Sequence, residues 1–168
     1  MMLNTQNSEL TPKKYLSSLS LIFIALLMGQ VLFAAVAFFI NENRSFNLLD
    51  TNNKLFYIIP LLALGSYVAS NFLFKQNINT IANNNNSLKE KLNGYQVALI
   101  IKLAIIEGPV LFGIVAFLIG GNLYFLFISG LLIIYFLMQK PSKEKIIETL
   151  KLNYEHRVEF DQSDRVFK

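Results

Sequence analysis

The sequence of 168 residues contains no cysteine, no tryptophan and a single histidine. The lack of cysteine excludes disulfides, thiolate metal sites, iron–sulfur clusters and cysteine nucleophiles. The one histidine, His156, lies in a polar C-terminal segment, which argues against a histidine-rich metal site or a Ser-His-Asp triad. No segment matches a phosphate-binding loop, a HExxH zinc motif or a GxSxG elbow. We therefore expect a protein that is not an enzyme and that holds no metal or other cofactor.

Charge is also scarce in this sequence. Charged residues make up 15% and hydrophobic residues 54%, whereas soluble chains carry about 25% charged residues. This composition is typical of a protein that crosses a membrane several times. The formal net charge is +4, but no basic stripe with interleaved aromatic residues suggests nucleic-acid binding. The expected partner is the lipid bilayer.

Four apolar stretches come close to the ~20 residues that a transmembrane helix needs. The predicted spans are 15–40, 55–74, 96–119 and 123–139, the last of them short. The turn at 120–122 is so brief that the last two spans should form an antiparallel hairpin. We expect an all-α, four-helix transmembrane bundle over residues 1–140, followed by a cytoplasmic tail over residues 141–168.

The positions of lysine and arginine predict the orientation, because cytoplasmic loops of membrane proteins carry an excess of both. On one side of the predicted membrane lie Lys13, Lys14, Lys75, Lys89, Lys91, Lys140, Lys143, Lys145, Lys151, Arg157, Arg165 and Lys168. The other side holds only Arg44 and Lys54. Both termini should therefore be cytoplasmic.

The tail begins with signals for a short helix. Pro141 should end the last span, and Ser142 is a plausible N-cap. Ile146 and Leu150 share one helical face, so we expect a short amphipathic helix on the cytoplasmic surface. Beyond Asn153 the charges are mixed, and we expect disorder there.

Two segments of the chain resemble each other. Residues 29–40 read GQVLFAAVAFFI and residues 108–119 read GPVLFGIVAFLI, with eight of twelve positions identical. A duplication would make two similar hairpins that point the same way, a parallel repeat with a pseudo-two-fold axis along the membrane normal. Chance likeness between apolar segments is the alternative.

The same offset brings small residues into correspondence. It equates Ala25 and Gly29 with Ala104 and Gly108. Small residues let membrane helices approach closely, so we expect the two hairpins to pack through these positions. The same faces are also suited to a homodimer, and another membrane protein is a possible partner.

Glu107 is the main candidate for a functional site. It lies near the middle of the third predicted span, and a carboxyl at that depth is costly and a functional candidate by default. Hydrocarbon favours its neutral form, which can donate and accept hydrogen bonds and release a proton if water arrives. Pro109 frees a backbone carbonyl nearby and should kink the helix. The alternative is a hydrogen bond between Gln30 and Glu107 that only holds two helices together.

Lys102 is five residues from Glu107 and so lies on a different helical face. We expect it to snorkel toward the cytoplasm rather than to pair with Glu107. If it faces the bundle instead, an acidic lipid headgroup or Asn71 is the expected partner. In the second span, Pro60 should produce a bend.

A polar cluster of hydroxyl, phenol and amide side chains follows Pro60 in the second span. These side chains either line a polar pocket or hydrogen-bond their own helix or a neighbour, and the second reading is the common one. The cluster consists of Ser66, Tyr67, Ser70 and Asn71.

Three segments carry a resemblance that spans most of the chain: GQVLFAAVAFF, KLAIIEGPVLFGIVAFLIGGN and PSKEKIIETLKL. With them the sequence resembles the small four-helix integral membrane proteins of unassigned function found in bacteria. That resemblance implies the bacterial inner membrane and no catalytic residues. Residues 106–113 are also similar to the ion-carrying helix of rotary-ATPase proteolipid (c) subunits, a likeness that covers one helix.

These observations favour a non-enzymatic multi-pass membrane protein with a structural or accessory role. The alternative function is that of a proton or cation conduit, or a coupling subunit, in which Glu107 is the titrating group.

Overall fold

The computed structural model describes residues 11–47, 53–84 and 87–161, and within them the fold is all-α with no strand. The helices are α1 (Pro12–Ile40), α2 (Leu55–Asn83), α3 (Leu88–Gly120), α4 (Leu123–Leu137), α5 (Lys143–Thr149) and α6 (Tyr154–Asp161). The one bridge of β type in these residues is an isolated pair, Ser45 with Asn122. The expected all-α class is therefore confirmed.

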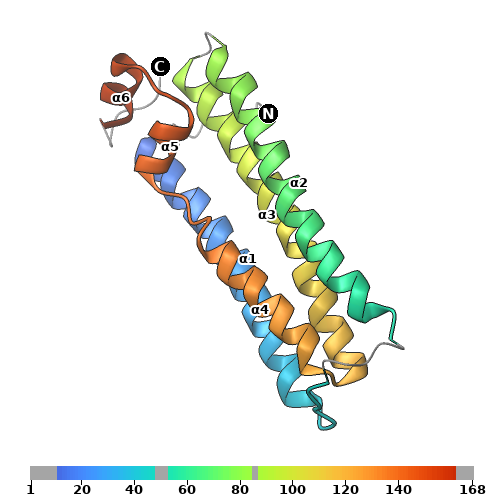
Figure 1. The fold of residues 1–168 in the computed structure, drawn as a ribbon. Helices are drawn as coiled ribbons and strands as arrows, with labels where there is room; N and C mark the ends of the chain where they lie inside the picture. Colours follow the sequence, from blue (N-terminus) through green and yellow to red (C-terminus); the bar gives the residue numbers. More distant parts are fainter. Residues whose placement is uncertain (1–10, 48–52, 85–86, 162–168) are drawn as a thin grey trace, which may run out of the picture.

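Helix α3 is the centre of the packing (Figure 1). It contacts α2 most extensively, then α4 and α1, while α4 also touches both α1 and α2. Helices α1 and α2 share at most marginal contact within the described residues. The structure therefore lacks the first of the two expected hairpins. Residues 41–54 are long enough to carry the chain to the opposite corner of the bundle, whereas the turn of Gly121 and Asn122 holds α4 beside α3.

The helices begin where capping chemistry allows. Thr11 accepts a hydrogen bond from the backbone of Lys14, and Pro12 occupies the first turn of α1. Ser87 and Glu90 form a capping box at the start of α3. Ser142 caps α5 by accepting from the Lys145 backbone N–H, as the sequence predicted.

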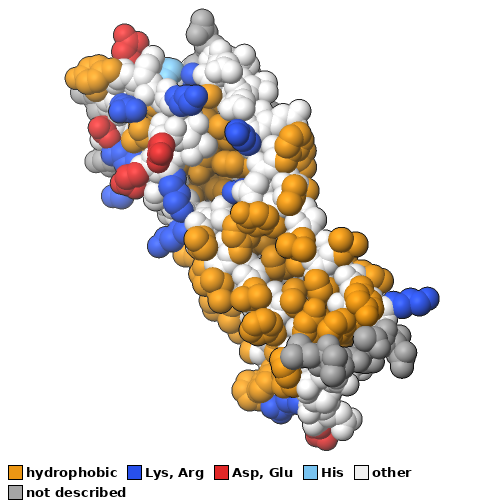
Figure 2. All heavy atoms as spheres, in the orientation of Figure 1, with side chains coloured by type: hydrophobic (Ala, Val, Ile, Leu, Met, Phe, Trp, Pro, Cys, Tyr) orange, Lys and Arg blue, Asp and Glu red, His pale blue; other side chains and the backbone are white. Residues whose placement is uncertain are grey.

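Three helices, α1, α2 and α3, are long and apolar enough to cross a membrane. Helix α4 is equally apolar but has 15 residues, which gives ~22 Å of helix against a hydrocarbon thickness of ~30 Å. Hydrophobic side chains cover most of the middle of the molecule in the view of Figure 2, as a lipid-facing surface requires. The chain therefore has the features of a membrane protein.

The molecule has two unlike ends. The start of α1, the end of α2, the start of α3 and helices α5 and α6 lie together (Figure 1). We call this the basic end, because its described lysines and arginines are Lys13, Lys14, Lys75, Lys89, Lys91, Lys140, Lys143, Lys145, Lys151 and Arg157. The opposite, loop end carries Arg44 and Lys54.

Two apolar clusters form the core, one toward each end. The cluster at the basic end includes Phe23 of α1, Tyr95 of α3 and Phe136 of α4. The tail contributes to this cluster, since Ile146 of α5 and Phe160 of α6 are fully buried in it. The expected disorder after Asn153 is therefore wrong for residues 154–161, where the hydrophobic Phe160 anchors α6.

The cluster at the loop end brings the two similar segments together. Phe38 and Phe117, equivalent positions of the repeat, stack with ring centroids 6.5 Å apart. Ala37 and its equivalent Ala116 are both buried. The similar segments therefore meet through corresponding residues, although the contacts of α2 and α4 are too unequal for a symmetric bundle.

Candidate functional site

A layer of buried polar side chains separates the two apolar clusters. Its members are Gln30 on α1 and Ser66 and Ser70 on α2. Along each helix these residues lie between a side chain of one cluster and a side chain of the other. This layer is the polar centre of an otherwise apolar bundle, and Glu107 lies at the same level of α3.

The hydroxyls of this layer bind nearby backbone carbonyls. Ser66 donates to the Ala63 carbonyl at 2.8 Å and Ser70 donates to the Tyr67 carbonyl at 3.1 Å. Asn71 donates to the Tyr67 carbonyl and exchanges hydrogen bonds with the Tyr135 hydroxyl at 2.7 and 3.0 Å. Bonding to their own helix or a neighbour, rather than to an open pocket, is confirmed for Ser66, Ser70 and Asn71.

Gln30 differs from the hydroxyls. Its side chain is 0% exposed, and neither its amide nitrogen nor its amide oxygen has a hydrogen-bond partner among the residues that the structure describes. The predicted bond to Glu107 is therefore absent. The physical reason is direction: Gln30 points into the bundle, whereas Glu107 is half-buried at its rim.

Glu107 borders the outer surface of α3. Its neighbours Ala104 and Gly108 are exposed, and so are Ile101 and Phe112 one turn further in each direction. The carboxyl has no hydrogen bond or ion pair within the described part of the chain. The structure thus places the acid where lipid or a second protein would meet it.

The small residues expected to join the helices do not do so. Ala25, Gly29, Ala104 and Gly108 are all exposed, and a Cβ added at either glycine would meet nothing within 4 Å. The predicted packing through these residues is wrong within one chain, because the buried face of each helix is set by its large apolar side chains.

The close approach of helices occurs elsewhere, at Gly113 of α3. A Cβ at this position would collide with the Ser129 hydroxyl, which donates to the Val110 carbonyl at 3.0 Å. This contact was not among those predicted from the sequence. The sequence signal for it was a glycine and a serine facing each other across the hairpin, since each is eight residues from Gly121.

Lys102 is buried, with 7% of its surface exposed, and faces α2. Its ammonium nitrogen lies 4.8 Å from the centroid of the Phe74 ring. Phe74 also contacts Tyr95, seven residues before Lys102 on α3, so the lysine points toward the basic end. It does not pair with Glu107, as expected from the helical spacing.

Pro60 and Pro109 both lie inside helices that continue past them. Each leaves the carbonyl four residues earlier without its helical N–H partner. The kink expected at each proline stays a prediction.

The described residues contain no group of three or more histidine, cysteine or acidic side chains that could hold a metal ion. The candidate site is therefore a buried polar layer with one unpaired amide and one carboxyl at the lipid-facing surface. Comparisons with models of protein families, with characterised proteins and with solved structures find no match for this chain.

Proposed function

We propose that this chain is a non-enzymatic, multi-pass protein of the bacterial inner membrane that acts by associating with another membrane helix. In this proposal α4 is a fourth span completed by residues 138–140, and the basic end faces the cytoplasm. The proposal agrees with the resemblance to small four-helix bacterial membrane proteins. Neither a cofactor nor a nucleic acid is part of it.

The observation that carries the proposal is the outer face of α3. Ala104 and Gly108 are exposed there, one turn apart, with the Glu107 carboxyl beside them. Small residues allow a second backbone to approach closely. A carboxyl in hydrocarbon is costly until it finds a hydrogen-bond partner, and a second helix packed on this face would supply one. The simplest second helix is α3 of another copy.

The test is the oligomeric state in lipid bilayers. Single-molecule photobleaching of labelled protein at increasing protein-to-lipid ratios should give two-step traces for the native chain. Gly108→Leu should shift the traces to one step, because the leucine blocks close approach. Gly65→Leu is the matched control, since Gly65 is an exposed, unobstructed glycine on α2. One-step traces for the native chain at every density would contradict a homodimer.

Proton or cation conduction through Glu107 is the second candidate function. It is favoured by one observation: the carboxyl is not used in a hydrogen bond within the described residues and is therefore free to bind an ion. Proteoliposomes with a pH gradient should then show a flux that Glu107→Gln abolishes. An equal flux for both proteins, or none for either, eliminates this candidate and leaves association.

A further inference from the structure

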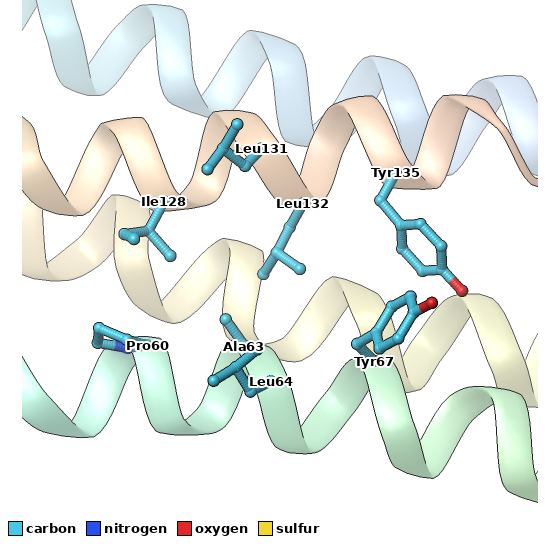
Figure 3. A pocket seen from close by; sticks show the side chains of 8 residues that line it. All are labelled: Pro60, Ala63, Leu64, Tyr67, Ile128, Leu131, Leu132 and Tyr135. Atoms are coloured by element: carbon cyan, nitrogen blue, oxygen red, sulfur yellow. The ribbon is translucent and has the colours of Figure 1, made fainter.

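A groove runs between α2 and α4 on the side of the molecule away from α1. It has a volume of about 450 Å³ and is lined by four residues of each helix: Pro60, Ala63, Leu64, Tyr67, Ile128, Leu131, Leu132 and Tyr135. Figure 3 shows these side chains facing one another across the gap between the two helices. The volume falls in the range of ~300–1,000 Å³ that small-molecule sites occupy.

The groove opens onto the surface that lipid would cover. Leu64 and Leu131 on its two walls are 66% and 49% exposed. Apart from two phenol hydroxyls, every side chain that lines it is a hydrocarbon. A hydrocarbon chain is therefore the chemistry that fits along its length.

One end of the groove is polar. Tyr67 and Tyr135 close it with ring centroids 5.0 Å apart, and their hydroxyls point the same way in Figure 3. The Tyr135 hydroxyl is bonded to Asn71, one turn beyond Tyr67 on α2. Phe74 follows after three more residues, under the Lys102 ammonium. The groove thus leads from apolar walls, past two phenols and an amide, to a lysine.

A second lysine lies at this end. The bond between Asn71 and Tyr135 sets α2 and α4 in register. Met138 and Phe74 each follow these residues by three positions, so Lys145 of α5, which binds the Met138 carbonyl, lies at the level of the Lys102 ammonium over Phe74. Its own position is fixed by hydrogen bonds to the carbonyls of Met138 at 2.8 Å and Lys140 at 3.1 Å, just after α4. Neither ammonium has a carboxylate partner in residues 11–47, 53–84 and 87–161. In Figure 2 basic side chains gather around a hollow at this end of the molecule.

Two neighbouring cations without an anion, one of them 7% exposed, are costly unless a negative group joins them. Basic pockets between transmembrane helices bind anionic lipid headgroups. The length can be compared along α2, where Phe74 lies 14 positions after Pro60, or ~21 Å of helix. One leaflet of the hydrocarbon core is ~15 Å thick, about ten residues of helix. A chain anchored at the lysines therefore passes Tyr67 and reaches Leu64, which lies ten residues before Phe74 on α2.

We propose that the α2–α4 groove and the Lys102–Lys145 pair form one binding site for an anionic phospholipid. The phosphate lies between the two ammonium groups, and one acyl chain passes Tyr67 and Tyr135 into the groove. The proposal rests on α2 and α4 lying in the bilayer. Resistance of the protein to extraction with alkaline carbonate tests that premise separately from the lipid site.

The absence of tryptophan from the chain permits a direct test. Leu64→Trp places a single tryptophan in the groove wall, and Leu32→Trp, at a 57% exposed position of α1, is the matched control. Each protein is reconstituted in phosphatidylcholine with increasing fractions of phosphatidylglycerol whose acyl chains carry bromine, a fluorescence quencher. Brominated phosphatidylcholine in unbrominated phosphatidylglycerol is the reverse titration.

The site predicts that brominated phosphatidylglycerol quenches Leu64→Trp at a low mole fraction and Leu32→Trp only in proportion to its abundance. Adding Lys145→Gln to Leu64→Trp should weaken this preference about five-fold, and Lys102→Gln should do so by a similar factor. Lys145→Arg should retain it. Equal quenching by the two lipids at residue 64, or a preference unchanged by both glutamine variants, would overturn the proposal.

Discussion

At the scale of single residues, Gln30 has the most buried polar atoms without a hydrogen-bond partner in the described part of the chain. A buried amide without a partner costs about 1–3 kcal/mol, and both polar atoms of this side chain lack one among the described residues. Phe23 and Ala37, two turns away in each direction on α1, belong to the apolar clusters on either side. The unpaired amide of Gln30 therefore lowers the stability of the folded state.

We therefore predict that Gln30→Leu raises the free energy of unfolding by about 1–3 kcal/mol, because leucine fills the same space without an unpaired polar group. Unfolding by SDS, followed by far-UV circular dichroism, measures the change. The double variant with Glu107→Gln should be additive within ~0.5 kcal/mol, since the two side chains are not bonded. If Gln30→Leu alone lowers stability, the amide of Gln30 has a hydrogen-bond partner in the membrane. A strongly non-additive effect in the double variant would identify that partner as Glu107.

Gly121 is constrained by its backbone. Its φ of 70° is left-handed, and an added Cβ would collide with the Asn43 carbonyl. Its own carbonyl accepts from the Ser45 backbone N–H at 3.0 Å, which ties the loop after α1 to the α3–α4 turn. The residue thus allows two chain segments to pack in contact at the loop end.

We predict that Gly121→Ala lowers stability by at least ~1–2 kcal/mol, the cost of the left-handed conformation alone. The adjacent Gly120→Ala is the control, because Gly120 ends α3 with open space around it. It should be neutral or slightly stabilising. Thermal unfolding in detergent compares the two, and an equal response of both variants would refute the strain argument.

At the scale of helices, apolar periodicity located the elements but not their ends. The second and third predicted spans stop at 74 and start at 96, whereas α2 ends at Asn83 and α3 begins at Leu88. Hydropathy reports the length of chain that lipid can solvate, and a helix does not stop at the lipid boundary. Ile78 and Leu92 are buried where the polar extensions of α2 and α3 pack together, and the capping box at Ser87 sets the start of α3.

The contacts between helices were the least predictable feature. A small-residue motif indicates that another helix can approach the backbone closely. It does not indicate which helices come into contact. Gly108 and Gly113 belong to the same helix and are indistinguishable by motif, yet only Gly113 meets another helix. What decides is the direction of the large side chains: Ile106, Val110 and Phe117 are fully buried and turn Gly113 inward with them.

This contrast gives a prediction for the α3–α4 contact. Gly113→Ala should lower the free energy of unfolding by about 1–3 kcal/mol, the usual cost of overpacking, because the new methyl group displaces the Ser129 hydroxyl from Val110. Gly108→Ala should leave the monomer's stability unchanged or raise it slightly. Steric trapping in bilayers measures both. If Gly108→Ala is the more harmful of the two, the outward direction of that face is wrong.

At the scale of the whole molecule, the charge distribution and the fold agree on which segments lie together. The described lysines that predicted one side of the membrane come from the start of α1, the end of α2, the start of α3 and residues 140–151, and the structure gathers these segments at the basic end. The unequal distribution of lysine between the two ends was predictable from the sequence. The lipid groove was not, since its walls come from α2 and α4, which are about 70 residues apart in sequence.

The orientation itself yields the last prediction. Because the native chain has no cysteine, single cysteines report their location without background. Asn43→Cys and Asn93→Cys form a matched pair of exposed asparagines, the first at the loop end and the second at the basic end. The excess of lysine at the basic end predicts that this end faces the cytoplasm. A membrane-impermeant maleimide added to intact cells should therefore label Asn43→Cys alone, and it should label both variants after lysis. Labelling of Asn93→Cys in intact cells would reverse the orientation. It would then place the Lys102–Lys145 pair in the outer leaflet, so that the anionic lipid it binds would come from that leaflet.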